Sequence, residues 1–228
     1  MGNDSLFRQA LALERDRAFA EAFSLFQRCC SDPAFDEGDL AFHCGWCLEN
    51  MGQSEQALAF YAKAAELSRI PSCKVNSYFR SGWIAMHERK HENAADFFRK
   101  AIDCGDLLFV QDDAYRHATY WYAVCLEAEG LYLDALVWYR RAQSLSPLLE
   151  PESRYRQILC LVRVGLYDEA LNVCRTFDAP APEEFDRSRY EELRSYARHE
   201  RSMLAACVNS EPAALDATET QGAAYAIR

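Results

Sequence analysis

Two short stretches carry residue types that could bind a metal or do redox chemistry. The segment 41–61, AFHCGWCLENMGQSEQALAFY, places His43 in front of Cys44 and Cys47. This C-x-x-C pattern occurs in redox centres and in halves of zinc sites. The stretch HERKH, residues 87–91, matches the H-E-x-x-H pattern of zinc proteases, in which two histidines of one helix hold the metal. Each pattern works only in a particular structural setting, which the rest of the chain must supply.

Composition and charge narrow the class of protein. Half of the 228 residues are hydrophobic, which excludes disorder throughout, and the net charge of −10 argues against a nucleic-acid binder. No run of about 18 apolar residues is present, so we expect no membrane span. The first residues lack the apolar core of a secretory signal. Ten cysteines without an export signal indicate a reducing cytoplasm and free thiols, hence a cytoplasmic protein.

The sequence repeats at an interval close to 35 residues. Alanines recur at spacings of 35, 37, 41 and 35 residues, each inside an apolar segment with helical spacing. These are Ala22, Ala57, Ala94, Ala135 and Ala170. Four residues later come Phe26, Tyr61, Phe98, Tyr139 and Cys174, and seven later Cys29, Ala64, Ala101, Ala142 and Phe177. Five residues earlier, Gly52, Gly130 and Gly165 mark three turns, whereas the first repeat has Arg17.

This pattern resembles the tetratricopeptide repeat family, whose unit is a helix-turn-helix of about 34 residues. The clearest copies are GQSEQALAFYAKAAEL, GLYLDALVWYRRAQSLSP and GLYDEALNVC. The resemblance implies an all-α fold, a right-handed α-solenoid of about five repeats plus a C-terminal capping helix. The expected units are 4–36, 38–71, 75–108, 116–149 and 151–182, with a cap helix over 183–207. Residues 1–207 then form the solenoid, and 208–228 form a flexible tail.

The steric reason for the repeat also explains the cysteines. A small alanine lets two helices approach closely, and the large side chain one turn later fills the space beside it. If each alanine is counted as position 20, Cys47, Cys125 and Cys160 all fall at position 10, which faces the inside of a helix pair. Free cysteine behaves as a small hydrophobic side chain. We therefore expect these thiols to fill space.

A thiol or zinc protein remains the alternative interpretation of the His43, Cys44 and Cys47 cluster. A thioredoxin-like C-x-x-C needs a βαβ setting, and a structural zinc needs four ligands, but neither is evident. In HERKH the turn between two helices is expected at residues 89–90, so the two histidines would not share a face. Phosphate-binding loops, nucleophile elbows and paired carboxylates are also missing. The sequence therefore predicts no enzyme, no metal and no cofactor.

In the family, positions 2, 5, 9, 12 and 13 of the first helices usually line a concave groove. In this chain position 5 is always aromatic, position 9 adds tryptophans, and position 6 adds arginines and one more tryptophan. The resemblance thus implies a peptide-binding set: Phe7, Arg8, Phe42, Trp46, Phe79, Arg80, Trp83, Tyr120, Trp121, Tyr155 and Arg156. Rings bury much area at low entropic cost, and arginine can grip carboxylates. The alternative is that the position-5 rings pack between helices as core.

The predicted function is a scaffold that binds a segment of another protein, one bearing aromatic or acidic side chains. Some relatives clamp the C-terminal carboxylate of chaperones, but of the five matching positions only Arg80 fits that pattern. Two alternatives remain beside the thiol or zinc protein. One is a chain that associates with itself into a homo-oligomer, and the other is an acidic chaperone of secreted substrates. We expect neither nucleic acid nor membrane as a partner.

Overall fold

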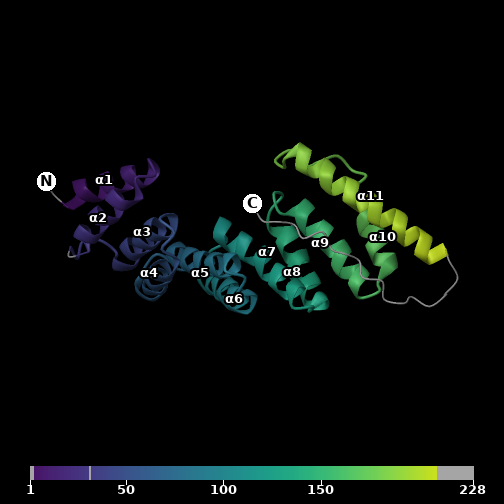
Figure 1. Ribbon diagram of the computed structural model, residues 1–228, viewed down its shortest axis with the longest axis horizontal. Coiled ribbons are helices and arrows are strands. Elements are labelled where there is room, and N and C mark those ends of the chain that lie inside the picture. Colours follow the sequence, from purple (N-terminus) through teal and green to yellow (C-terminus); the bar gives the residue numbers. More distant parts are fainter. Residues whose placement is uncertain (1–2, 31, 210–228) are drawn as a thin grey trace.

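The computed structural model describes residues 3–30 and 32–209, and within them the chain forms eleven α-helices and no strand. The first helices of successive pairs are α1 (Asn3–Arg15), α3 (Glu37–Asn50), α5 (Pro71–His87), α7 (Asp113–Ala128) and α9 (Glu150–Arg163). The second helices are α2 (Phe19–Cys29), α4 (Ser54–Leu67), α6 (His91–Leu108), α8 (Tyr132–Leu145) and α10 (Tyr167–Thr176). The final helix is α11 (Arg187–Asn209). The pairs follow one another in an elongated array (Figure 1), which confirms the all-α repeat fold.

Every pair turns through the same backbone geometry. The residue five before the repeat alanine has a positive φ in all five pairs: Arg17 (63°), Gly52 (77°), Arg89 (59°), Gly130 (78°) and Gly165 (77°). The following residue donates its N–H to the carbonyl oxygen five residues back, as from Gln53 to Leu48 at 2.9 Å. This is the bond that closes a helix through a left-handed residue. Glycine adopts that conformation without strain, whereas the two arginines do so against their preference.

The repeat positions form the core. All five alanines at position 20 are fully buried, as are the large side chains one turn later in the first four pairs. The two helices of a pair approach closely at Gly82, because a Cβ there would lie 2.7 Å from the ring of Phe98. Gly45 stands in the same relation to Tyr61, at 2.9 Å. The contact between the helices of these pairs therefore requires a residue without a side chain.

Capping side chains fix where helices begin. Asp36 accepts the backbone N–H of Asp39 at 2.8 Å at the start of α3, and it also accepts the backbone N–H of Arg69 at 3.0 Å. At the other end of the chain, the helix expected over 183–207 runs Arg187–Asn209, since Asp186 accepts the backbone N–H of Arg189 at 2.7 Å. The tail expected from residue 208 lies, from residue 210 on, outside the described residues.

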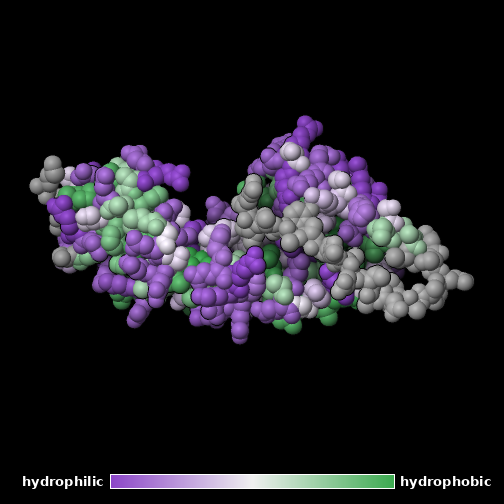
Figure 2. Space-filling model, viewed as in Figure 1, coloured by the Kyte–Doolittle hydropathy of each residue, from purple (hydrophilic) through white to green (hydrophobic). Residues whose placement is uncertain are grey.

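One edge of the molecule is hollowed on the face that Figure 2 presents. Figure 2 shows it between the helices at the N-terminal end and α11. None of the helices in residues 3–30 and 32–209 is long and apolar enough to cross a bilayer.

Candidate functional site

The residues predicted to bind a peptide all lie on first helices, and we call the side of these helices that carries them the inner face. In the first four pairs, the position-5 ring contacts a ring of the second helix of the same pair. The centroids are 5.8 Å apart for Phe7–Phe26, 5.6 Å for Phe42–Tyr61, 6.0 Å for Phe79–Phe98 and 5.8 Å for Tyr120–Tyr139. In the fifth pair, Tyr155 contacts Tyr196 of α11 at 5.7 Å. All except Tyr120 also remain partly exposed, so these rings combine packing with some access to solvent.

We call the contact between successive pairs a junction and name it by its two first helices. At the α3/α5 junction, Arg80 donates through Nε to Glu49 Oε2 at 3.1 Å, and its Nη2 pairs with the other carboxylate oxygen. Tyr61 donates its hydroxyl to Glu49 at 2.6 Å, and the Arg80 guanidinium lies 4.6 Å from the centroid of the Trp46 ring. Burial and the Glu49 charge raise the pKa of Tyr61. The Arg80 and Glu49 side chains are only 19% and 13% exposed, so the pair is largely withdrawn from water.

The α7/α9 junction repeats this arrangement. Arg156 on α9 donates to Glu127 Oε1 on α7 at 3.1 Å, and the Tyr139 hydroxyl donates to Glu127 Oε2 at 2.5 Å. Burial alone would lower the pKa of Arg156, but Tyr120 and Glu127 beside it raise that pKa above its ordinary value. Arg156 therefore stays charged and forms its ion pair with a carboxylate of its own chain.

At the α1/α3 junction a histidine takes the place of the arginine. His43 Nδ1 lies 2.8 Å from Glu14 Oε2, and the imidazole stacks on Phe26 with centroids 4.9 Å apart. A glutamate at position 12 of one pair thus meets a basic side chain at position 6 of the next. Arg8 stands at position 6 of the pair α1–α2. It is exposed and pairs with Asp4 at 3.0 Å on its own helix.

The α5/α7 junction, which we call the central junction, departs from this rule. Position 12 is Met86 and position 6 is Trp121, and both belong to one apolar cluster. Rings gather on the inner face here, and we call Phe79, Trp83, His87, His117 and Trp121 the central ring cluster. Trp83 lies 5.2 Å from Trp121 and 4.6 Å from His87, and Phe79 lies 6.4 Å from Trp83 and 6.2 Å from His117. Apolar rings thus occupy the place where the other junctions carry an ion pair.

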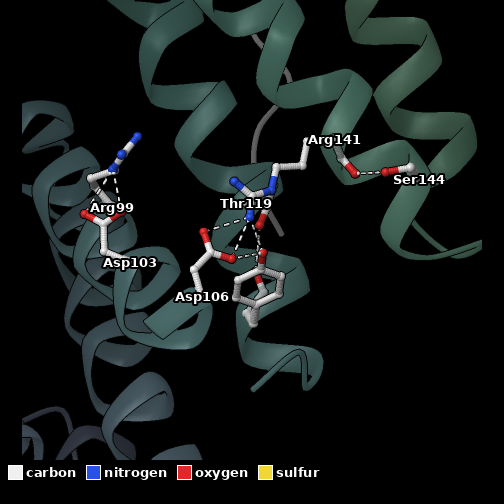
Figure 3. A network of polar contacts seen from close by, with 7 residues as sticks. Arg99, Asp103, Asp106, Thr119, Arg141 and Ser144 are labelled. Carbon is white, nitrogen blue, oxygen red and sulfur yellow. Dashed lines mark hydrogen bonds and ion pairs between the residues drawn. The ribbon is translucent and has the colours of Figure 1, made fainter. Parts of the chain in front are cut away.

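The ion pair of the central junction lies between the second helices of the two pairs, α6 and α8. Arg141 of α8 donates through Nη2 to both carboxylate oxygens of Asp106 on α6, at 2.7 and 2.8 Å (Figure 3). Tyr115 of α7 donates its hydroxyl to Asp106 at 2.7 Å. Burial alone would raise the pKa of Asp106, but the hydrogen bonds from Tyr115 and Arg141 lower it below its ordinary value. This ion pair therefore joins the two helix pairs through their second helices and not through the inner face.

The thiols of the C-x-x-C pattern are buried. Cys44 and Cys47 have no exposed surface, and burial raises the pKa of Cys47 to about 12. Cys125 and Cys160, at the same repeat position, are equally buried with a pKa of about 12 for the same reason. A thiol of this kind stays protonated at neutral pH and is a poor nucleophile and metal ligand. The cysteines of position 10 fill space in the core.

The two histidines of HERKH lie on different helices. α5 ends at His87 and α6 begins at His91, with Arg89 in the left-handed turn between them. His87 instead directs Nδ1 at the carbonyl oxygen of Trp83, 2.9 Å away. Across residues 3–30 and 32–209, no group of three or more His, Cys, Asp or Glu side chains is arranged to hold a metal ion.

The comparisons with known proteins identify the class. The tetratricopeptide repeat family model matches residues 39–71 and 75–103, which fall on the pairs α3–α4 and α5–α6. The chain therefore carries tetratricopeptide repeats over these two pairs, and the other three pairs share their turn geometry and their buried alanines. Repeats of this family form scaffolds that bind protein or peptide partners. A comparison with curated proteins finds no match.

Several solved structures share the fold. One of MamA aligns with a TM-score of 0.58 and 16% identity over 86% of this chain and 96% of that one. The apo form of RapI aligns with a TM-score of 0.64 and 14% identity over 77% and 69%. YrrB, described as a tetratricopeptide protein with an unusual peptide-binding site, aligns with a TM-score of 0.61 and 21% identity over 80% and 83%. At these identities the likeness shows the fold alone.

Sequence reasoning missed the glutamates of position 12, which decide what the arginines can do. Glu14, Glu49 and Glu127 each stand eight residues before a repeat alanine. That spacing was a usable signal, because position 12 of one pair and position 6 of the next come together at every junction that carries both charges. The family resemblance by itself places Arg80 and Arg156 in the peptide-binding set, where they could grip carboxylates.

Proposed function

We propose that the chain is a scaffold that binds a peptide segment of a partner protein along its inner face. The observation that carries the proposal is the central ring cluster, where five rings of α5 and α7 lie in one contiguous contact series. Partly exposed aromatic rings grouped in this way mark interaction surfaces, because they bury large areas at low entropic cost. YrrB, a structural neighbour, is described as having a peptide-binding site, which agrees with this use of the fold.

The proposed contacts are drawn from the predicted set, with two kinds of role. The tryptophans Trp46, Trp83 and Trp121 supply contact area, as binding hot spots commonly do. The arginines Arg80 and Arg156 hold the junctions and shape the surface between the rings. Phe7, Arg8, Phe42, Phe79, Tyr120 and Tyr155 complete the proposed inner face.

The double variant Trp46→Ala/Trp83→Ala tests this function. Immobilised protein is incubated with a native lysate, and captured proteins are compared between wild type and variant by mass spectrometry. We expect the variant to lose the specifically captured protein while its circular dichroism remains helical. Phe109→Ala is the matched control, because that ring is 93% exposed and lies on the loop after α6, away from the predicted set. Undiminished capture by the double variant would remove the proposal.

A further inference from the structure

We infer that the central ring cluster takes an aromatic side chain of the bound segment, and that carboxylates of the segment are not what the inner face recognises. This inference rests on the proposed function and specifies its ligand. The occupant is a partner peptide with an aromatic anchor, placed at the α5/α7 junction.

The first step concerns the arginines. Beyond the first pair, the inner face offers His43, Arg80 and Arg156 as basic groups at position 6, and each contacts a glutamate of the preceding pair. Glu49 and Glu127 also receive a tyrosine hydroxyl. If a carboxylate of a partner bound either arginine, it would displace a largely buried glutamate and leave that glutamate without its counter-ion. Removing one partner of such a pair is strongly unfavourable, so these arginines are poor receptors for acidic peptides.

The second step concerns the central junction, where the pattern changes. Met86 replaces the glutamate and Trp121 replaces the arginine, so no charge remains at these two positions. The tie between these two pairs is made instead by Asp106 and Arg141 on the second helices. The inner face of this junction carries ring contacts in place of an ion pair, and the partly exposed rings of Trp83 and Trp121 are available to a ligand.

The third step concerns the geometry of the rings. Trp83 and Trp121 meet edge to face, at an interplanar angle of 74°. Such a corner presents one ring face and one ring edge, and an incoming aromatic side chain can pair with both, since aromatic rings favour edge-to-face and offset contacts. His87 and His117 extend the surface at either end with polar rings. This combination suits an aromatic residue flanked by polar backbone.

The experiment is a selection of random 12-residue peptides, displayed on phage, against the intact protein. Selected peptides are synthesised with a fluorescent label, and their dissociation constants are measured by fluorescence anisotropy. We expect enrichment of Trp, Tyr or Phe at one fixed position. Replacing that residue by Ala in the peptide is expected to weaken binding at least tenfold, whereas replacing acidic residues changes it less than threefold.

Two protein variants locate the anchor. Trp121→Ala removes one ring, and Met86→Glu/Trp121→Arg gives the central junction the pair that the α3/α5 and α7/α9 junctions already carry. The second variant introduces the ion pair of those junctions without their tyrosine hydroxyl, because Phe98 stands where Tyr61 and Tyr139 donate, so its urea midpoint is measured beside its affinity. We expect both to bind at least tenfold more weakly than wild type, with helical circular dichroism retained, while Phe109→Ala binds as wild type does.

The outcomes separate this inference from the proposed function. Peptides enriched in Asp or Glu, whose binding falls with Arg80→Gln and not with Trp121→Ala, would overturn the aromatic anchor and leave the scaffold function standing. Aromatic peptides that bind equally to wild type and to both central variants would also overturn it. If no peptide is selected, or if selected peptides ignore Trp46→Ala/Trp83→Ala as well, both proposals fall.

Discussion

The α7/α9 junction and the central junction solve the same packing problem in two ways. At α7/α9 the inner face is closed by Glu127, Arg156 and the Tyr139 hydroxyl, all within hydrogen-bonding distance. At the central junction the charges are moved to the second helices, and Trp83 and Trp121 meet on the inner face. A largely buried ion pair fixes the geometry of the contact between repeats, but its charged groups are bound to each other and have little capacity left to bind a ligand. Met86 and Trp121 at the same positions carry no charge and leave that capacity to a ligand.

The difference teaches that similar residues on one face need not share a role. Arg80 and Trp121 both stand at position 6 of a first helix, yet one completes a junction and the other belongs to the proposed binding surface. Such a division is favourable in a repeat array, because stability is carried by contacts between neighbouring units. One junction can then be altered for binding while its neighbours keep the array rigid.

The largest expected effect comes from breaking the α7/α9 junction. Glu127→Ala leaves the mostly buried Arg156 without a counter-ion and the Tyr139 hydroxyl without its acceptor. We expect a loss of about 3–5 kcal/mol in the free energy of unfolding, measured by urea denaturation. Asp113→Ala is the control, because its exposed pair with Arg116 is worth about 0.5 kcal/mol or less. A loss below about 1 kcal/mol for Glu127→Ala would mean that this pair does not hold the junction.

The next effect concerns packing within α5–α6, the pair that carries half of the central ring cluster. A methyl group at Gly82 would lie 2.7 Å from the Phe98 ring, and Phe98 in turn contacts Phe79. Gly82→Ala should therefore cost about 1–3 kcal/mol through overpacking. It should also weaken peptide binding by displacing Phe79. A melting temperature equal to that of wild type would show that the packing between α5 and α6 accommodates a methyl group at residue 82.

A smaller effect ties stability to pH through Asp36. Burial works against the charge, but N–H groups of Arg69 and Asp39 lower the pKa of Asp36 to about 2, from an ordinary value of 3.8. Its contribution is therefore complete above about pH 4 and is lost as the pH falls towards 2. Asp36→Ala should lose about 1 kcal/mol at pH 7, typical of a helix N-cap, and less at pH 2.5. An equal loss at both pH values would contradict this assignment.

The smallest effect is a gain. Arg17 and Arg89 occupy turns in which the other three pairs use glycine at the same positive φ. Arg17→Gly and Arg89→Gly should each raise the free energy of unfolding by about 0.5–1 kcal/mol, while Gly130→Ala lowers it by a similar amount. Chemical denaturation of the three single variants gives the comparison. A loss in both arginine variants would indicate that these side chains make contacts that outweigh the backbone strain.

The sequence predicted the features that depend on local spacing. Ala57, Tyr61 and Gly52 carry the contact and turn rules within a single pair, so the pattern placed them correctly, and the positive φ of Arg89 follows from the same rule. The roles of Arg80 and Arg156 depend on the register between successive pairs, which no single unit contains. The presence of Met86 and Trp121 in place of an ion pair is evident only from a comparison of the central junction with the α3/α5 and α7/α9 junctions.

The most direct test of this account is the affinity of one selected aromatic peptide for wild type and for Met86→Glu/Trp121→Arg, measured by isothermal titration calorimetry. The account predicts that the variant keeps the wild-type urea midpoint within experimental error and binds at least tenfold more weakly. Equal affinity in a variant that is fully folded would contradict it, because the rings of the central junction would then play no part in binding.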